Sequence, residues 1–503
     1  MWYVVQAGDT LFKIAQKFGV TVPQLTVANQ LTGTTINIGQ RLFIPVYTSR
    51  VIVHTVRPGD TLYQLARQYG TLVESIMIRN DLTSTTLNVG QRLVIPQYTE
   101  AIVTVNEANI RSGPGENYEV ITTMVRTARL PVTGITPQWL KIRLYNENPG
   151  WIARRITSLG VHDGSKPIMG ILGFYTLEEG PALPGSFRSF AENPQYLSQT
   201  GLFMYRFNRE DPGIIEKFGT FTDEEVRTLI AIGHRNNVMM LPVIHNLLYR
   251  PGGQAAGREV ARRLVTDPDT RQRAIAGIIR LIEQFNFDGV NIDIEDVFQE
   301  DSRDLSTFYV ELGRALTQRG FFFSASIPSR IRDEPFNPFS DPFDYKVIGA
   351  AVDQFVVMLY NEHGWPGSPP GPAVSAGWMN RVLGYTMTKM PKEKIFAAIS
   401  VFGFDFNLTT GRNLYVSYAA AMNLARRYNA GIVFDEGQLT PYFRYTDGEG
   451  NRHEVWFENE TSITAKIRLA WQHGIGGVAL WRLGMEDPAT WVRIGREIVV
   501  KKL

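Results

Sequence analysis

The last two thirds of the chain show a regular alternation of hydrophobic patterns. Short, almost entirely apolar runs alternate with longer stretches in which apolar residues recur every three or four positions. The first pattern is typical of strands buried on both faces, and the second of amphipathic helices. We expect eight such strands, at residues 167–175, 202–207, 238–244, 289–295, 321–327, 354–360, 395–402 and 476–481.

Eight buried strands separated by helices predict a (β/α)8 barrel over residues 166–503. In such barrels the reactive side chains lie at the carboxyl ends of the strands. The longest gap between strands runs from Gly403 to Ile475 and has a mixed pattern of its own. We therefore expect an α+β insertion after the seventh strand.

Acidic and amide side chains interrupt the fourth of these strands at alternate positions. Asn291, Asp293 and Glu295 alternate with apolar residues in the sequence GVNIDIE. Because a strand alternates its faces with a period of two, all three should point into the barrel. Two carboxylates this close influence each other's ionisation, so one proton can be shared and one pKa raised, which suits a general acid. The alternative is a structural acid cluster, in an ion pair or a metal site.

The first hundred residues contain one pattern twice, with an offset of 51 residues. The stretch 4–20 resembles 54–70, with Gly8 matching Gly59, and 36–45 aligns with 87–96, with Gly39 matching Gly90. In each copy a β run meets a Gly-Asp turn, a Thr that can cap a helix, a second helical stretch and a final strand. The pattern predicts two small βααβ domains, at residues 1–47 and 50–98.

Residues 101–159 have a different character, with short β-rich runs separated by Gly, Pro and Asn turns. This pattern predicts a small all-β barrel. The stretch GVHDGSKP at 160–167 reads as a linker to the large barrel.

The composition, 44% hydrophobic and 20% charged over 503 residues, is typical of a globular protein with several domains. No apolar run is long enough for a membrane span, and the N-terminus lacks the pattern of a signal peptide. The chain has no cysteine, which excludes disulfides and thiolate chemistry. Residues 1–160 hold 15 Lys and Arg against 9 Asp and Glu, which suits an anionic polymer or an ordinary solvated surface.

No cofactor, metal or nucleic acid is expected from the motifs. The seven His residues lack metal-binding spacing, and His245 and His363 are expected to be packing or rim residues. No phosphate-binding loop is present, and there is no basic cluster for nucleic acid. The sequence leaves the oligomeric state open.

The repeated motifs GDTL and GQ-x-L-x-I-P resemble the LysM domain. This resemblance implies binding of glycans that contain N-acetylglucosamine, through the loops around the first and second strands. The residues that it implies for glycan contact are Gly8, Asp9, Thr10 and Asn29 in the first copy and Gly59, Asp60, Thr61 and Asn80 in the second. Capping of the helices is the alternative role for the Asp and Thr residues. In residues 101–159, ANIRSGPG, WLKIRL and GWIARRI resemble bacterial SH3-like domains.

The segment DGVNIDIE resembles the fourth-strand motif DGxDxDxE of glycoside hydrolase family 18, which includes chitinases and related N-acetylglucosaminidases. MLYN at 358–361, GFY at 173–175 and Trp481 agree with the sixth, first and eighth strands of that family. The resemblance implies substrate-assisted, retaining catalysis in which the substrate's own 2-acetamido oxygen is the nucleophile.

The resemblance also implies a role for each matching residue. Glu295 would be the general acid and base, Asp293 would orient the acetamido group, and Tyr360 would donate a hydrogen bond to it. Trp481 would form the floor of the sugar site. The remaining members of the implied site are Tyr175, for which core packing is the alternative, Met358 and Asn361 at the substrate, and Asn291 and Asp288 in support, Asp288 at the start of the strand.

Two departures from the motifs of family 18 point to a subgroup of that family. Asn291 replaces the middle Asp of the family motif, which should allow Asp293 to be held without repulsion between like charges and should shift the pH profile. The third strand reads MMLPVIHN where chitinases carry S-x-G-G. Together with the LysM domains, these features resemble the cortical-fragment-lytic N-acetylglucosaminidases of spore-forming bacteria.

The expected function is therefore a peptidoglycan hydrolase of the cell wall or spore. It would cut β-1,4 bonds after N-acetylglucosamine and be anchored to glycan by its LysM domains. A chitinase that acts on chito-oligosaccharides is one alternative. A non-catalytic glycan-binding protein of the wall or spore coat is another, although the retained Glu295 argues against it.

Overall fold

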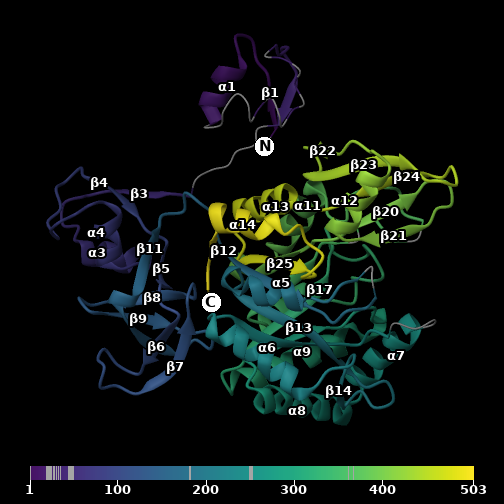
Figure 1. The fold of residues 1–503 in the computed structure, drawn as a ribbon, viewed down its shortest axis with the longest axis horizontal. Helices are drawn as coiled ribbons and strands as arrows, with labels where there is room; N and C mark the ends of the chain where they lie inside the picture. The colour runs from purple at the N-terminus through teal and green to yellow at the C-terminus, as the bar shows by residue number, and fades with distance from the viewer. Residues whose placement is uncertain are drawn as a thin grey trace.

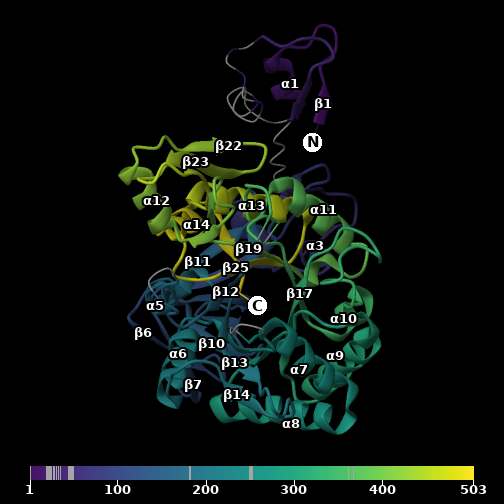
Figure 2. The same cartoon turned by 90° about the vertical axis from the view of Figure 1, so that its right-hand side faces the viewer.

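The computed structural model describes residues 2–18, 25, 29, 31, 33, 35–43, 50–180, 183–248, 253–360, 362–365 and 367–502. Three small domains precede one large barrel, and the first of them lies apart from the rest in both views (Figures 1 and 2).

The large domain is a closed barrel of eight parallel strands. Each strand pairs with the next along the chain, and the first pairs with the last, which closes the sheet. The strands are β12 (Ile168–Tyr175), β13 (Gln199–Phe207), β15 (Met239–His245), β16 (Gly289–Asp293), β17 (Phe322–Pro328), β18 (Gln354–Met358), β19 (Ile395–Ser400) and β25 (Gly477–Trp481). The predicted (β/α)8 barrel is confirmed.

Amphipathic helices cover the outside of this sheet. They are α5 (Phe187–Glu192), α6 (Asp223–Arg235), α7 (Gly253–Thr266), α8 (Pro268–Phe285), α9 (Ser302–Thr317), α10 (Tyr345–Ala351), α11 (Ala376–Thr386), α13 (Glu460–His473) and α14 (Ala489–Glu497). Local signals set where they begin: Thr222 and Glu225 form a capping box at α6, and Asp267 caps α8 just before Pro268. Two short strands, β14 (Ile215–Lys217) and β26 (Val499–Val500), extend the sheet at β13 and β12.

A five-stranded antiparallel sheet is inserted between β19 and α13. Its strands are β20 (Gly403–Asn407), β21 (Asn413–Val416), β22 (Val433–Asp435), β23 (Thr440–Thr446) and β24 (Arg452–Trp456), in the order β21-β20-β24-β23-β22. Helix α12 (Tyr418–Arg427) packs its Ala421 and Ala425 against Phe443 and Val455 of this sheet. The predicted α+β insertion after the seventh strand is confirmed.

The three N-terminal domains also match the predicted classes. In the first repeat β1 (Trp2–Val4) pairs with β2 (Arg41–Phe43), and α1 (Leu11–Phe18) lies between them in sequence. The second repeat contains β3 (Ile52–Thr55), α3 (Leu62–Tyr69), α4 (Val73–Arg79) and β4 (Arg92–Ile95).

The third domain is a seven-stranded antiparallel barrel. Its strands are β5 (Tyr98–Val103), β6 (Glu107–Arg111), β7 (Val120–Val125), β8 (Arg129–Ile135), β9 (Trp139–Arg143), β10 (Pro149–Ala153) and β11 (Thr157–His162). Strand β11 pairs with β5 as far as His162. Residues 160–162, which were predicted to begin the linker at 160–167, therefore belong to this strand.

The SH3-like domain packs on the amino-terminal end of the large barrel, and the second repeat packs on the SH3-like domain. The ring of Tyr145 stacks on His234 at the end of α6, with centroids 3.9 Å apart. Asn237 donates a hydrogen bond to the carbonyl of Arg129 over 3.0 Å. The SH3-like domain therefore lies on the base of the large barrel, at the end opposite the carboxyl ends of the barrel strands, and the second repeat lies beside the SH3-like domain (Figure 1).

A salt bridge and a cation–π contact complete this assembly. Arg79 of α4 donates to Asp163 over 2.9 Å and so ties the second repeat to the end of the SH3-like domain. Arg50 donates to the carbonyl of Gln472 over 2.9 Å and lies 4.7 Å above the ring of Trp471. Both contacts join segments that are distant in the sequence.

Lys502 provides a test of the packing at this base. Its ammonium group is fully buried and donates to the carbonyls of Pro194, Leu197 and Asn236, and burial, with a smaller effect of Arg129, lowers its pKa to about 7. Because its pKa is lower in the folded chain than in the unfolded chain, where lysine titrates near 10.4, the unfolded chain binds more protons between these values and stability rises with pH. The stability difference between wild type and Lys502→Met, measured by denaturant unfolding, should shift in favour of wild type from pH 7 to about 10. Lys166→Met is the control, since Lys166 is exposed and also donates to a backbone carbonyl, that of Arg496, over 2.7 Å. A pH-independent difference for Lys502→Met would contradict the assignment.

Candidate active site

The two candidate carboxylates lie at and just beyond the end of β16. The strand ends at Asp293, so the prediction that Glu295 lies within it was wrong. The neighbouring strand β15 ends at His245, which is in register with Asp293, and the chain then turns as the Leu247 amide donates to His245 Nδ1. Glu295 therefore lies beyond the last residue pair of β15 and β16.

The side chain of Asn246 takes the place of the missing strand partner. Its Oδ1 accepts from the Glu295 amide over 2.9 Å, and its Nδ2 donates to the Glu295 carbonyl over 2.8 Å. The next residue, Asp296, has a left-handed backbone with φ of 54° and is ion-paired with Arg258 of α7, with Nε to Oδ1 at 3.0 Å. The loop after β16 is thus held from two sides.

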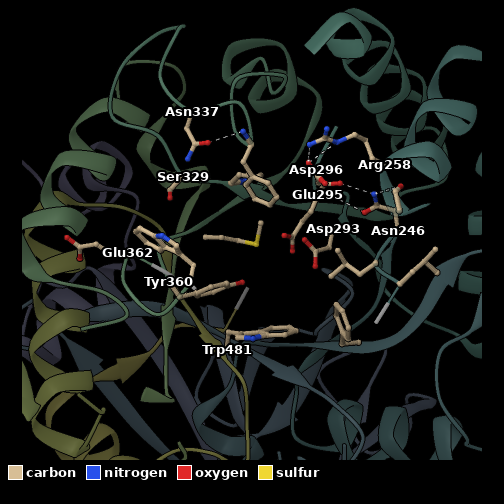
Figure 3. A pocket seen from close by; sticks show the side chains of 18 of the residues that line it. Asn246, Arg258, Asp293, Glu295, Asp296, Ser329, Asn337, Tyr360, Glu362 and Trp481 are labelled. Carbon is tan, nitrogen blue, oxygen red and sulfur yellow. Dashed lines mark hydrogen bonds and ion pairs between the residues drawn. The ribbon is translucent and has the colours of Figure 1, made fainter. Parts of the chain in front are cut away.

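A cleft of about 670 Å³ opens at the carboxyl ends of the barrel strands. Asp293 and Glu295 point into it, with Trp481 on the opposite wall and Tyr360 beside them (Figure 3). The cleft is rich in aromatic side chains, which present flat apolar faces to a ligand. These are Phe203, Phe336, Phe339, Tyr360, Trp365, Trp378, Phe402, Tyr415 and Trp481.

Burial raises the pKa of both carboxyls. Asp293 is 5% exposed, its Oδ1 has no hydrogen-bond partner, and burial together with the nearby Glu295 charge raises its pKa well above the usual value. Burial and the Asp296 charge raise the pKa of Glu295 to about 7. One of the two carboxyls can therefore hold a proton near neutral pH, as a general acid requires.

Asn291 is fully buried and belongs to a chain of neutral hydrogen bonds across the barrel. Its Nδ2 donates to Ser324 Oγ over 2.8 Å, Ser324 donates to Gln354 over 2.8 Å, and Gln354 donates to Gln199 over 2.7 Å. Ser326 donates to Asn291 Oδ1 over 3.0 Å. An ionised carboxylate cannot donate, so this chain explains why an amide occupies position 291. The amide bonds to these serines and not to Asp293, contrary to our expectation.

Three of the other predicted residues line the cleft. Tyr360 lies two residues past the end of β18, and Met358 is the last residue of that strand. Trp481 is packed between Phe174 and Phe203, with ring centroids 5.3 and 5.1 Å away, and the Tyr360 ring lies 6.2 Å from it. The indole is therefore held rigidly against the barrel interior.

Tyr175 and Asp288 do not reach the cleft, and Asn361 lies outside the described residues. In β12 it is Phe174 that faces the interior, so Tyr175 points outward and packs edge-to-face on Phe190. Asp288 lies at the other end of the barrel, where it accepts from the Met240 amide over 2.7 Å and contacts His234. Core packing and support of the barrel base are the roles that the structure gives these two side chains.

Several cleft residues were not predicted from the sequence. Asn246 and Arg258 come from the end of β15 and from α7, and Tyr415 comes from β21 of the insertion. The position of His245 and Asn246 at the end of a barrel strand is a signal that could have indicated Asn246. Nothing in the local sequence of Tyr415 shows that the insertion folds back over the cleft.

The predicted glycan-contact residues of the two repeats take part in turns, caps and tethers. Gly8 and Gly59 have φ of 85° and 88°, which the Gly-Asp turns require. Asp9 and Asp60 accept from the amides three residues earlier, and Thr10 and Thr61 accept from the third amide after them. Asn29 donates to Leu25, and Asn80 joins Ile76 of α4 to Val94 of β4. Each has a structural role of its own, and glycan contact by them stays a prediction.

Neither a metal nor a membrane span is indicated by the described part of the chain. Within it, no group of three or more His, Asp or Glu side chains could hold a metal ion. No described helix is both long and apolar enough to cross a bilayer.

A closed (β/α)8 barrel with two carboxyls of raised pKa at the end of its fourth strand, in an aromatic cleft, is the arrangement expected of a glycoside hydrolase. Residues 247–486 match the model of glycosyl hydrolases family 18, residues 3–45 and 54–96 match the LysM domain, and residues 106–157 match the bacterial SH3 domain. The chain therefore carries a family 18 glycosyl hydrolase domain behind two LysM domains and a bacterial SH3 domain.

Similar proteins come from several bacteria. The putative sporulation-specific glycosylase YdhD of Bacillus subtilis is 26% identical over 88% of this chain and 98% of its own length. The cortical fragment-lytic enzyme of the same organism is 29% identical over 62% of this chain and 70% of its own. The crystal structure of the Bacillus cereus spore cortex-lytic enzyme SleL covers 100% of this chain and 99% of its own, at 23% identity and a TM-score of 0.60.

Substitution of Asn291 by Asp tests the neutral hydrogen-bond chain. The new carboxylate should lower the free energy of unfolding by about 1–3 kcal/mol at neutral pH, because a buried donor is lost. Burial would raise the pKa of the new carboxyl above its unfolded value, so the folded state would bind the proton more tightly and the loss should shrink as pH falls toward 4. Chemical denaturation at several pH values measures this. Ser324→Ala is the control, with a loss independent of pH, and equal pH dependence of both variants would contradict the assignment.

Proposed function

We propose that this protein is a peptidoglycan-cleaving N-acetylglucosaminidase of the bacterial spore cortex or cell wall. The observation that carries the proposal is the pair of carboxyls at the end of β16, with Asp293 buried and Glu295 half-buried, which faces Trp481 across an aromatic cleft. The names of the relatives, a sporulation-specific glycosylase and a cortical fragment-lytic enzyme, support the cortex as the substrate.

In the proposed reaction Glu295 gives its proton to the oxygen of the β-1,4 bond as the bond to the anomeric carbon breaks. The acetamido oxygen of the same sugar attacks that carbon from the opposite face and forms an oxazolinium ion with inversion at that carbon; the second inversion, when water opens the ring, gives net retention. Asp293 stabilises the positive charge that develops on the acetamido group, and Tyr360 donates to its oxygen. Glu295, now a carboxylate, takes a proton from the water that opens the ring, which restores the starting state.

The LysM domains would localise this activity to a glycan polymer. Their family supports binding to glycan, so they would hold the enzyme at an insoluble polymer and raise the local substrate concentration. We propose association with the spore cortex or the cell wall as the location.

A chitinase is the second candidate. A chitinase of Chromobacterium violaceum has a similar structure, at 25% identity over 65% of this chain and a TM-score of 0.58. Both candidates use the same acetamido chemistry, so only the substrate separates them.

The variant Glu295→Gln tests the enzymatic proposal. The amide cannot give or take the required proton, so turnover of cortex fragments should fall by about 10²-fold or more. Wild-type activity should decline as the pH rises through about 7, because the acid form of Glu295 is lost there. Product analysis by mass spectrometry, with chitin oligosaccharides in parallel, measures both. Equal rates for the variant and wild type would refute catalysis by Glu295, and faster turnover of chitin would favour the chitinase.

Removal of residues 1–49 tests the role of the first LysM domain. Because none of the described residues between 2 and 43 lines the catalytic cleft, turnover of soluble oligosaccharides should stay unchanged. Binding to insoluble cortex material should weaken by about 10²-fold if both repeats bind glycan together. Sedimentation of protein with the polymer measures the binding, and an unchanged affinity would show that the first repeat does not contribute.

A further inference from the structure

The loop that carries Glu295 depends on one amide side chain. Besides its two hydrogen bonds to the Glu295 backbone, Asn246 Nδ2 donates to the carbonyl of Gly257 in α7 over 3.0 Å. Asn246 is 1% exposed, although it borders the cleft. All three of these bonds join it to backbone, so its orientation is determined by the fold and not by a mobile partner.

The chemistry of this contact requires an amide. The Glu295 backbone offers a donor and an acceptor side by side, as the next residue of a strand ladder would meet them. Among side chains of this size, only that of Asn presents one acceptor and one donor in a plane. Aspartate would lack the donor, and alanine would leave two buried backbone groups without partners.

Helix α7 is built to approach this amide closely. A Cβ at Gly257 would lie 2.9 Å from the carbonyl oxygen of Asn246, so a larger residue there would push the helix away. The following residue, Arg258, holds Asp296 in its left-handed backbone. The first turns of α7 therefore support residues 295 and 296 by two separate contacts.

We propose that Asn246 is a positioning residue for the general acid, which replaces the missing strand partner and sets where the Glu295 carboxyl lies in the cleft. This inference rests on the proposed function of Glu295. It extends that function to a side chain that does not itself reach the reacting atoms, and Gly257 and Arg258 of α7 complete the support.

The position of the Glu295 carboxyl determines its surroundings. The charged and titratable side chains that line the cleft around it are Arg258, Asp293, Asp296, Tyr360, Glu362 and Tyr415. If the backbone contact is removed, the carboxyl can turn toward solvent and leave the buried position beside Asp293. Catalysis should then weaken at the chemical step, while the aromatic walls that bind the sugar stay in place.

The variants Asn246→Ala and Asn246→Asp test the proposal because they should shift the upper limb of the pH–rate profile in opposite directions. For alanine, we expect kcat to fall by about 10²-fold, with KM within about two-fold of wild type, since a displacement of about 1 Å has this effect. The upper limb of its pH–rate profile should move below the wild-type position, because a more solvated Glu295 loses its proton earlier. For aspartate, the added negative charge should move the same limb upward.

Asn236→Ala is the matched control. Asn236 is also a buried asparagine that donates to backbone, to the carbonyl of Ile232, but it lies at the base of the barrel. The Asn236→Ala variant should lose about as much stability as Asn246→Ala, and it should keep the wild-type kcat and pH profile. A loss of kcat in Asn246→Ala with an unshifted pH limb, or equal shifts in Ala and Asp, would overturn the positioning role.

Hydrogen–deuterium exchange separates this proposal from the proposed function. In Asn246→Ala the peptide that contains residues 294–298 should exchange faster, because the Glu295 amide loses its acceptor, while Asn236→Ala should leave it unchanged. Unchanged exchange there would overturn the proposal even if the enzyme is active. Faster exchange in a protein whose wild type cleaves no glycan would refute the proposed function and leave the loop contact supported.

Discussion

The burial of two carboxyl groups at the end of a parallel ladder is the constraint on which the cleft depends. A charge taken out of water must be paired, hydrogen-bonded or protonated. Asp293 and Glu295 meet this requirement by sharing a proton between two carboxyls of raised pKa, while Asp296 beside them is paired with Arg258. The surrounding aromatic rings provide apolar faces for a sugar.

The same constraint explains the neutral layer below the carboxyls. Asn291 lies one inward position deeper in β16 than Asp293, and its neighbours Ser324 and Gln354 are also uncharged. A third acid at this depth would add a like charge to a pair that already shares a proton. A chain of neutral donors and acceptors satisfies every partner without charge, so the ionisable groups are confined to the carboxyl-terminal edge where the substrate can reach them.

Much of this could be predicted from the sequence because the barrel strands are almost wholly apolar and the polar exceptions stand out. Asp293 and Glu295 were indicated by their alternation with apolar residues on one strand, and Tyr360 and Trp481 by the resemblance to family 18; the structure brings all four into one cleft. Tyr175 was misplaced because an apolar strand gives no sign of which alternate residues face inward: Phe174 and Tyr175 fit either face equally well. Tyr415 could not be found, because its position depends on how the insertion folds back, a tertiary contact without local signal.

The arrangement of the domains separates binding from cutting. The SH3 domain is joined to the base of the barrel by Tyr145, and Arg79 joins the second LysM domain to the end of the SH3 domain. Arg50, just before the second LysM domain, bonds to Gln472 at the same base, whereas the cleft opens at the opposite end. A glycan strand held by the second LysM domain would therefore lie on the far side of the barrel from Glu295. Such a strand could reach the cleft only by passing around the domain, so the glycan that anchors the enzyme and the glycan that it cuts are more simply two neighbouring strands of the same polymer.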